Sequence, residues 1–281
     1  MNRPVLADDA FLDDVAAARR DEPGALHVWW LGQSGFMVAW AGRVLVLDPY
    51  LSDSLTAKYA GTERPHVRMT ERVVDPARLD FVDVVTSSHN HTDHLDAETL
   101  VRLLAASPAA RLVAPEANRA FVAERLGIDP SGPIGVDDGV TVALDPFALT
   151  GVPAAHEEVE RDEAGRCRFM GYVIRCGPWA LYHAGDTVRY RGMAERLRPF
   201  AVDLALLPIN GADPARGVAG NLDGPEAARL ARDVGAGLAV PCHYEMFEFN
   251  TAPPDAFVAE AERLGQPHAV LRAGQRLTLG P

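Results

Sequence analysis

Three histidines and one aspartate lie within six consecutive residues, 89–94, in the sequence SHNHTDH (residues 88–94). The segment follows an apolar run typical of a buried strand and precedes a stretch with helical spacing. Because side chains alternate along extended backbone, His89 and His91 are expected on one side, whereas Asp93 and His94 fall where the chain turns into the helix. Zinc, manganese and iron accept imidazole nitrogens and carboxylate oxygens as ligands. The segment therefore predicts a metal site, in preference to a polar loop that holds these histidines by chance.

Three further residues of metal-ligand type share one kind of position. His156, Asp186 and His243 each stand just after a predicted strand. Any one of them alone would more often be an ordinary surface or core residue. Loops at one edge of a sheet can converge on one site, however, and two metal ions need about this many ligands. Their shared placement therefore favours a site for two metals.

The elements that must position these residues are strands early in the chain and alternating strands and helices later. Short β-type runs are predicted at residues 26–31, 36–40 and 44–47, and an irregular polar insertion follows at 52–71. Strands are predicted at 81–86, 111–114, 140–144, 147–152, 170–175, 179–182, 202–207 and 237–241, with helices at 96–105, 116–126, 193–198, 224–234 and 254–264, and a last pair of short strands near the end. This order predicts an α/β fold of two sheets with helices outside.

An amphipathic helix is predicted at residues 7–20, where apolar side chains recur at helical spacing. We expect residues 1–24 to form a helical extension packed on one domain of residues 25–281, with a mobile tail as the alternative. The first residues lack the basic start and apolar run of a signal peptide. No apolar stretch reaches the roughly 18–20 residues of a membrane span. The expected location is the cytoplasm.

The charge balance excludes some classes of partner. The 281 residues include 27 Lys+Arg and 39 Asp+Glu, which gives a formal net charge of −12. An acidic chain is a poor general binder of nucleic acid or of an anionic membrane, so we expect a small-molecule substrate. The 3 cysteines cannot build a disulfide framework in a chain of this size.

In its order of ligand-type residues, HxHxDH followed by His156, Asp186 and His243, the chain resembles the metallo-β-lactamase superfamily. The resemblance spans roughly residues 29–243. More narrowly, the stretches WWLGQSG (29–35), YHAGDT (182–187), LPING (207–211) and VPCHYEMF (240–247) resemble the L-ascorbate-6-phosphate lactonase (UlaG-like) group. The implied fold is the αββα sandwich, in which two mixed β-sheets are flanked by helices and the metal site lies at one edge of both sheets.

The resemblance also implies a role for each ligand-type residue. It assigns His89, His91 and His156 to one metal, Asp93, His94 and His243 to a second, and Asp186 to a bridge between the two. The implied cofactors are two divalent ions, zinc or manganese, with iron as a further candidate.

Two residues are expected to support the ligands without binding metal. The resemblance suggests that Asp48, in the sequence LDP, orients a ligand histidine through a hydrogen bond, the alternative being an ordinary Asp-Pro turn. His183 lies three residues before Asp186 in a predicted strand, and we expect it to be buried and hydrogen-bonded rather than a ligand.

The implied activity is that of a metal-dependent hydrolase in which a metal-bound hydroxide attacks and Asp93 or Asp186 is the catalytic carboxylate that orients it. A serine nucleophile is not needed, and GQSG at 32–35 lacks the Gly-x-Ser-x-Gly spacing of a nucleophile elbow. The narrower resemblance favours a lactone of a small polar sugar acid, phosphorylated or not. A small or lipid phosphodiester is the alternative for the same site, and a non-catalytic metal-binding or scaffold protein is a third hypothesis.

Substrate contacts are expected from residues close to the metal ligands in sequence. Tyr244 follows a ligand, Asn90 lies between two ligands, and Gln33 occupies a turn bounded by glycines. Arg216, in a predicted loop, could clamp a phosphate or carboxylate, the alternative being a solvated surface charge. His66, in the 52–71 insertion, is expected to be solvated, with a substrate contact as the alternative. The resemblance is also compatible with a homo-oligomer.

Overall fold

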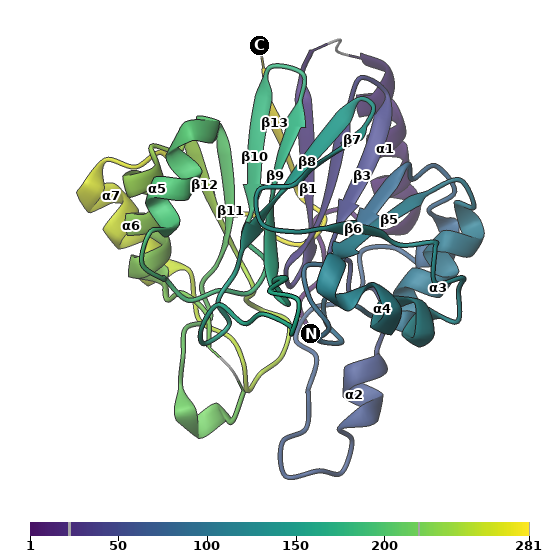
Figure 1. Ribbon diagram of the computed structural model, residues 1–281, viewed down its shortest axis with the longest axis horizontal. Coiled ribbons are helices and arrows are strands. Elements are labelled where there is room, and N and C mark those ends of the chain that lie inside the picture. The colour runs from purple at the N-terminus through teal and green to yellow at the C-terminus, as the bar shows by residue number, and fades with distance from the viewer. Residues whose placement is uncertain (22–23, 219, 281) are drawn as a thin grey trace.

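The computed structural model describes residues 1–21, 24–218 and 220–280. Two β-sheets pack face to face in the middle of the molecule (Figure 1). The seven-stranded sheet has the strand order β13 (Arg276–Leu279), β1 (Leu26–Gly32), β2 (Gly35–Trp40), β3 (Arg43–Leu47), β4 (Val84–Thr86), β5 (Arg111–Pro115) and β6 (Ile134–Val136). The six-stranded sheet has the order β12 (Leu238–Cys242), β11 (Leu204–Pro208), β10 (Trp179–His183), β9 (Met170–Cys176), β8 (Phe147–Pro153) and β7 (Thr141–Leu144).

Both sheets are mixed. In the first, β13, β1, β2 and β3 pair antiparallel, whereas β3 to β6 pair parallel. In the second, β7 to β10 pair antiparallel and β10 to β12 pair parallel. Short connections join the antiparallel neighbours β1 to β2, β2 to β3, β7 to β8 and β9 to β10, whereas segments that contain helices join the parallel neighbours.

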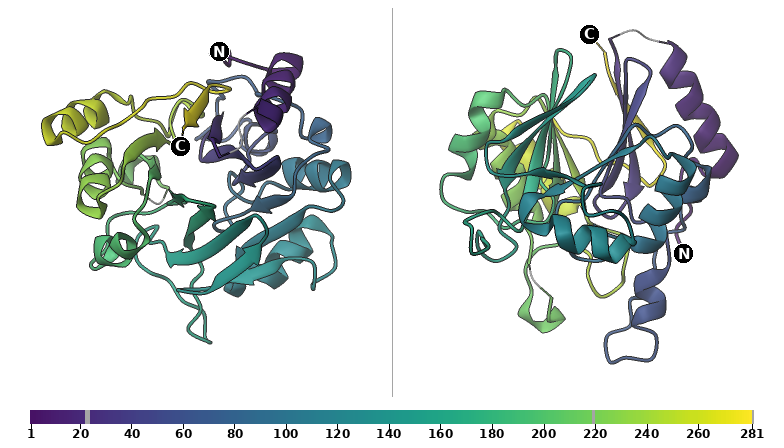
Figure 2. Two further views of the ribbon diagram at one scale, coloured as in Figure 1. Left: turned by 90° about the horizontal axis from the view of Figure 1, so that it is seen from above. Right: turned by 45° about the vertical axis from the view of Figure 1, so that its right-hand side comes forward.

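Helices cover the outer face of each sheet (Figures 1 and 2). The first sheet carries α1 (Asp8–Asp21), α3 (Ala97–Ala106) and α4 (Arg119–Leu126), and the second carries α5 (Met193–Leu197), α6 (Gly224–Val234) and α7 (Asp255–Leu264). Short 3-10 turns lie at η1 (Pro76–Arg78), η2 (Glu116–Asn118), η3 (Arg198–Phe200) and η4 (Pro214–Arg216). This layering confirms the αββα sandwich expected from the sequence. None of the described helices is long and apolar enough to cross a membrane.

Strand β1 shows how the sequence builds the layers. All seven of its residues are buried, because it has neighbours on both faces. Val28 and Trp30 belong to the core between the sheets, whereas Trp29 and Leu31 belong to the core beneath the helices. Side chains alternate along a strand, so a strand buried on both faces requires a mostly apolar run, and β1 has one polar side chain, His27.

Helix α1 packs on the first sheet through Phe11, Val15 and Ala18, which are fully or almost fully buried. The indole Nε1 of Trp29 donates to Asp14 Oδ2 at 2.8 Å and fixes the helix to β1. The expected boundary between residues 1–24 and 25–281 adjoins residues 22–23, which lie outside the described residues, and the division into two parts stays a prediction.

Two expectations about local structure were wrong. The insertion at 52–71 is not wholly irregular, because it contains the helix α2 (Ser54–Lys58), which projects from the body in Figure 1. The last two extended segments do not pair with each other. Instead, His268 bridges to Ala239 beside the second sheet, and β13 pairs with the otherwise open edge of β1 in the first. Each segment thus satisfies the backbone groups of a different sheet.

Candidate metal centre

The seven ligand-type residues lie in loops that follow four strands. The loop after β4 contains His89, His91, Asp93 and His94, and the loops after β8, β10 and β12 contain His156, Asp186 and His243, respectively. These loops meet at one edge of the two sheets, so residues up to 154 positions apart in sequence are brought together. The convergence expected from the strand ends is what the structure has.

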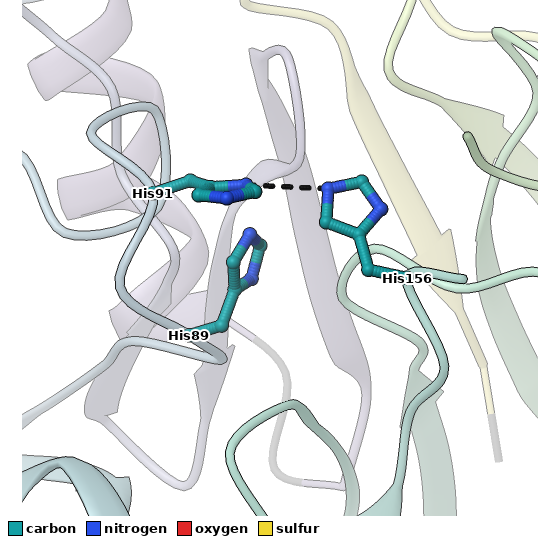
Figure 3. A group of neighbouring side chains, drawn as sticks. All are labelled: His89, His91 and His156. Carbon is teal, nitrogen blue, oxygen red and sulfur yellow. Dashed lines mark hydrogen bonds between the residues drawn. The ribbon is translucent and has the colours of Figure 1, made fainter. Parts of the chain in front are cut away.

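Three histidines form the first group, His89, His91 and His156, and one ligand atom from each lies within 4.8 Å of the others. Their rings point toward a common centre from two loops (Figure 3). His156 Nε2 lies 3.2 Å from His91 Nδ1. The side chain of Phe169 packs beside all three rings at centroid distances of 5.1–5.9 Å.

The second group is Asp93, His94, Asp186 and His243, whose ligand atoms also lie within 4.8 Å of one another. Asp186 Oδ1 is 3.2 Å from His94 Nε2, and Asp186 Oδ2 is 3.3 Å from His243 Nε2. The same Oδ2 lies 3.5 Å from His156 Nε2 in the first group. Asp186 is therefore the carboxylate that touches both groups, as a bridging ligand must.

Hydrogen bonds behind the rings decide which imidazole nitrogen faces the centre. Asp48 Oδ2 lies 2.8 Å from His94 Nδ1, and Gly220 O lies 2.9 Å from His156 Nδ1. A carboxylate or carbonyl oxygen only accepts, so both Nδ1 atoms carry a proton and both Nε2 atoms face the cluster. A metal ion would therefore bind at Nε2, in place of any proton there.

Asp48 lies behind the motif and accepts several hydrogen bonds while being fully buried. Besides His94, its carboxylate accepts from Thr86 Oγ1 at 3.0 Å, from the backbone N–H of Ser88 at 3.0 Å and from the Ser88 hydroxyl. The orienting contact expected of Asp48 is therefore present. Sequence reasoning missed Ser88, whose hydroxyl also lies 3.0 Å from His89 Nδ1. The residue is small and polar, and its neighbours in sequence gave no signal of these contacts.

Several backbone positions at the site are in the left-handed region. Gln33, Asp48 and His243 have φ values of 52°, 39° and 62°. A residue with a Cβ held there costs of order 1–3 kcal/mol, and such residues cluster at functional sites. Gly185, which precedes Asp186, has φ +61°, and a Cβ there would lie 2.8 Å from Met170 O. Strained backbone at three residues, and a glycine before Asp186, therefore orient the side chains of this site.

The charges of the cluster stabilise one another. Burial alone would lower the pKa of His94, but the carboxylates of Asp186 and Asp93 outweigh burial and raise this pKa well above its usual value. Burial would raise the pKa of Asp186, but His243 and His94 hold that pKa well below the usual carboxylate range. Asp186 is therefore ionised, and a buried pair of carboxylates attracts positive charge.

These residues fit a pair of divalent metal ions. His89 Nε2 is buried and has no hydrogen-bond partner in the described part of the chain. A buried polar atom without a partner is costly, and coordination of a cation would satisfy it. Nitrogen and carboxylate donors in two adjacent groups match the ligand preferences of zinc, manganese and iron. The assignment of the seven residues to two metals remains our proposal.

A cavity of about 440 Å³ opens onto the cluster. The metal-centre residues His91, Asp93, His156, Asp186 and His243 form its floor. Its walls come from the 52–71 insertion and from the segments after β11 and β12. The residues concerned are Leu55, Lys58, Tyr59, Gly217, Val218, Phe247, Phe249 and Asn250. The sequence did not predict that these segments form a pocket together. The cavity has the size typical of a small-molecule site.

Of the four residues predicted to contact substrate, Asn90 and Gln33 lie at the cavity or directly behind its floor, whereas Tyr244 and Arg216 do not. Asn90 lines the cavity, and its substrate contact stays a prediction. Gln33 is buried and lies behind the floor, where its amide Nε2 donates to Asp93 Oδ2 at 2.8 Å and lies 3.1 Å from His243 Nε2. Gln33 therefore contacts cluster residues directly, which its position in a glycine-bounded turn did not reveal.

Tyr244 and Arg216 do not line the cavity, and their expected substrate contacts are corrected here. The Tyr244 ring packs on Trp30 at 4.4 Å between centroids, and its hydroxyl donates to Leu271 O. Its side chain is thus part of the core. The Arg216 guanidinium donates to backbone carbonyls, among them Asn210 O and Thr251 O. It ties down the loop that supplies Gly220 O to His156.

His183 is buried, and its Nε2 donates to Ser34 O at 2.8 Å. It therefore holds the turn that carries Gln33, and no hydrogen bond from it to a cluster residue is present among the described residues. His66, expected to be solvated, instead lines the cavity and stacks on Tyr59 at 4.1 Å between centroids. The insertion that carries it was recognised, but its contacts were not.

Comparison with known proteins bears on the family. Residues 43–244 match the family model for the beta-lactamase superfamily domain. The chain is 32% identical over 257 residues to a UPF0173 metal-dependent hydrolase of Opitutus terrae, covering 90% of this chain and 99% of that protein.

Two solved structures share the fold. One is Igni18, a metallo hydrolase from Ignicoccus hospitalis, with a TM-score of 0.67 at 22% identity, covering 91% of this chain and 99% of that one. The other is an isothiocyanate hydrolase from Delia radicum gut bacteria, with a TM-score of 0.70 at 19% identity, covering 89% of this chain and 98% of that one. Together with the family match and the metal-type cluster, these likenesses lead to one conclusion: the chain belongs to the metallo-β-lactamase superfamily of metal-dependent hydrolases.

Proposed function

We propose that the protein opens a lactone of a small polar sugar acid, phosphorylated or not. The observation that carries the proposal is the cavity of about 440 Å³ whose floor is formed by five residues of the seven-residue cluster. Divalent cations held there would supply an activated water and a Lewis acid at neutral pH. In the reaction, the water oxygen bonds to the carbonyl carbon, the ring C–O bond breaks and the released alkoxide takes a proton. The narrower resemblance of four sequence stretches to lactonases supports this substrate class.

Asp93 is the better placed of the two proposed catalytic carboxylates. Both oxygens of Asp186 face ring nitrogens, Oδ1 toward His94 and Oδ2 toward His243, and the side chain is 4% exposed. The Asp93 side chain is 17% exposed at the cavity floor, and Gln33 donates to its Oδ2. Gln33 thus holds the carboxylate in place while leaving it accessible. We assign Asp93 the proton acceptor role and Asp186 the role of joining the two ligand groups.

A phosphodiester is the second candidate substrate. Lys58 and Arg125 line the cavity, and cationic side chains can bind a phosphate or a carboxylate group. Lys58 is also the only lysine in the chain. The net charge of −12 restricts this candidate to small or lipid phosphodiesters and argues against long nucleic acid.

The proposal is tested with L-gulono-1,4-lactone and bis(p-nitrophenyl) phosphate as probes, before and after chelation. We expect lactone hydrolysis that chelation abolishes and that zinc or manganese restores. His91→Ala should abolish it, whereas His268→Ala should not, because that ring lies beside Phe257 and away from the cluster. Full activity in the chelated protein would contradict a metal mechanism. Hydrolysis of the phosphodiester alone would favour the second candidate, and stoichiometric metal without turnover would favour the scaffold hypothesis.

A further inference from the structure

Four aromatic rings form one wall of the cavity above the metal centre. His66 stacks on Tyr59 at 4.1 Å between centroids with an interplanar angle of 14°. The same ring lies 4.4 Å from the Phe249 ring and 5.2 Å from the Phe247 ring. We refer to these four residues, Tyr59, His66, Phe247 and Phe249, as the ring wall. They come from two separate segments of the chain, so their meeting is a property of the fold.

Only one ring of the wall is part of the core. Phe247 is 2% exposed and packs on Tyr50 at 5.7 Å between centroids, so it supports the wall from behind. Tyr59, His66 and Phe249 are half-buried and line the cavity. Large apolar rings left partly open at a concave site mark a place for an apolar group of a ligand.

The His66 ring is held as a flat, neutral surface. Its backbone carbonyl accepts a hydrogen bond from Thr56 Oγ1 at 2.8 Å, and its Nδ1 lies 3.2 Å from Arg64 O. Nδ1 therefore carries the proton, and the ring is fixed against rotation. Burial lowers the pKa of His66, so the ring is uncharged at neutral pH. The wall offers π-faces rather than a cation at this position.

The wall and the metal centre line one cavity, so one small molecule can contact both. We propose that the ring wall binds a planar, unsaturated ring of the substrate while the hydrolysed bond faces the metal centre. Among lactones and esters, the wall thus favours those fused or joined to an aromatic ring, in place of the sugar acid that the four sequence stretches favour. This inference rests on the proposed function only for the position of the hydrolysed bond at the metal centre. Binding of an aromatic ring by the ring wall does not require that hydrolysis occurs. An aromatic contact contributes about 0.5–1.5 kcal/mol beyond the area it buries.

The test compares two lactones that differ only in planarity. 3-Isochromanone carries a benzene ring fused to a six-membered lactone, and its saturated counterpart has the same lactone fused to a puckered cyclohexane ring. Neither leaving group is a phenol, so the intrinsic reactivity of the two esters is similar. We expect the wild-type, metal-loaded full chain to have a KM about fivefold lower for 3-isochromanone, the ratio that about 1 kcal/mol gives.

Variants assign the preference to the wall. Phe249→Leu and His66→Leu each remove one ring and should bring the KM ratio close to one. Two variants are used so that a folding defect in one does not decide the result, and circular dichroism and metal content check both. Phe200→Leu is the matched control, because Phe200 packs against the core near α5 and outside the cavity.

The outcomes separate the inference from the proposed function. Hydrolysis of both lactones with equal KM, or a preference that survives both wall variants, overturns the ring wall and leaves hydrolysis standing. If neither lactone is hydrolysed, the L-gulono-1,4-lactone assay still decides the lactonase proposal, and the intact isochromanones become ligands whose Kd is measured by equilibrium dialysis. A lower Kd for 3-isochromanone that Phe249→Leu and His66→Leu abolish still supports the ring wall, and equal Kd values overturn it.

Discussion

Asp48 Oδ2 lies 2.8 Å from His94 Nδ1, and both side chains are completely buried. The two residues are 46 positions apart, one after β3 and the other in the histidine-rich loop after β4. A buried carboxylate is costly unless it is fully hydrogen-bonded, and Asp48 accepts from His94, Ser88 and Thr86. The contact fixes both the tautomer and the angle of the His94 ring. Asp48 therefore acts on the metal centre through His94.

Replacing Asp48 with asparagine should weaken metal binding without removing a ligand. The amide keeps the shape of the side chain but removes the charge that holds the Nδ1 proton of His94. Losing such a supporting carboxylate costs about 10- to 100-fold in metal affinity. Zinc affinity is measured by competition with a chromophoric chelator, and Asp80→Asn, at an exposed position outside the site, is the control. Equal affinities for Asp48→Asn and wild type would show that the contact is not functional.

Gly185→Ala should displace Asp186 and destabilise the fold. Gly185 has φ +61°, and its Cβ would lie 2.8 Å from both Met170 O and the Ser88 side chain. Gly165 has φ +79°, and no described atom would lie within 4 Å of its Cβ, so Gly165→Ala measures the backbone cost alone, about 1–2 kcal/mol. Crowding should add about 1–3 kcal/mol at Gly185. Urea unfolding compares the two variants, and equal losses of stability would refute the crowding argument.

Glu260 should make the contact between α6 and α7 sensitive to acid. Its carboxylate accepts from Arg263 Nε and Arg229 Nε, each at 2.6 Å, and these contacts, Arg263 first, lower its pKa from 4.5 to about 2. A depressed pKa contributes stability that is complete above the unfolded pKa and is lost as the pH falls toward the folded one. The contribution should therefore be present at neutral pH and decline between about pH 4.5 and 2.

The urea midpoints of wild type and Glu260→Gln report this contribution. The variant should have the lower midpoint at neutral pH, and the gap should narrow on acidification below pH 4.5. Glu262→Gln, exposed on the same helix, should show no comparable gap. A gap that stays constant or widens in acid would mean that the ionised Glu260 does not stabilise the helix pair.

The sequence was most informative where chemistry and local structure coincide. The HxHxDH segment is compact, and His156, Asp186 and His243 each follow a strand, so topology alone brings them to one edge. The fold was predictable for a similar reason. Runs such as β1 are mostly apolar on both faces, and later runs alternate with helical patterns.

Contacts between distant segments could not be predicted in this way. Tyr244 follows His243 in sequence, but His243 adopts φ 62°, and the turned chain carries Tyr244 into the core against Trp30. Arg216 lies in a loop, but its guanidinium donates hydrogen bonds to backbone carbonyls and does not face the cavity. The ring wall joins residues from 59 to 249, and no local pattern in either segment signals the other.

Metal content tests the central claim, that two groups of side chains hold two divalent ions. After equilibration with zinc and removal of free metal, elemental analysis should find about two zinc ions per wild-type chain. His156→Ala, in the first group, and His243→Ala, in the second, should each retain about one, while His268→Ala retains the wild-type content. A wild-type chain without bound zinc, manganese or iron, or variants that both keep the full wild-type content and affinity, would contradict the account.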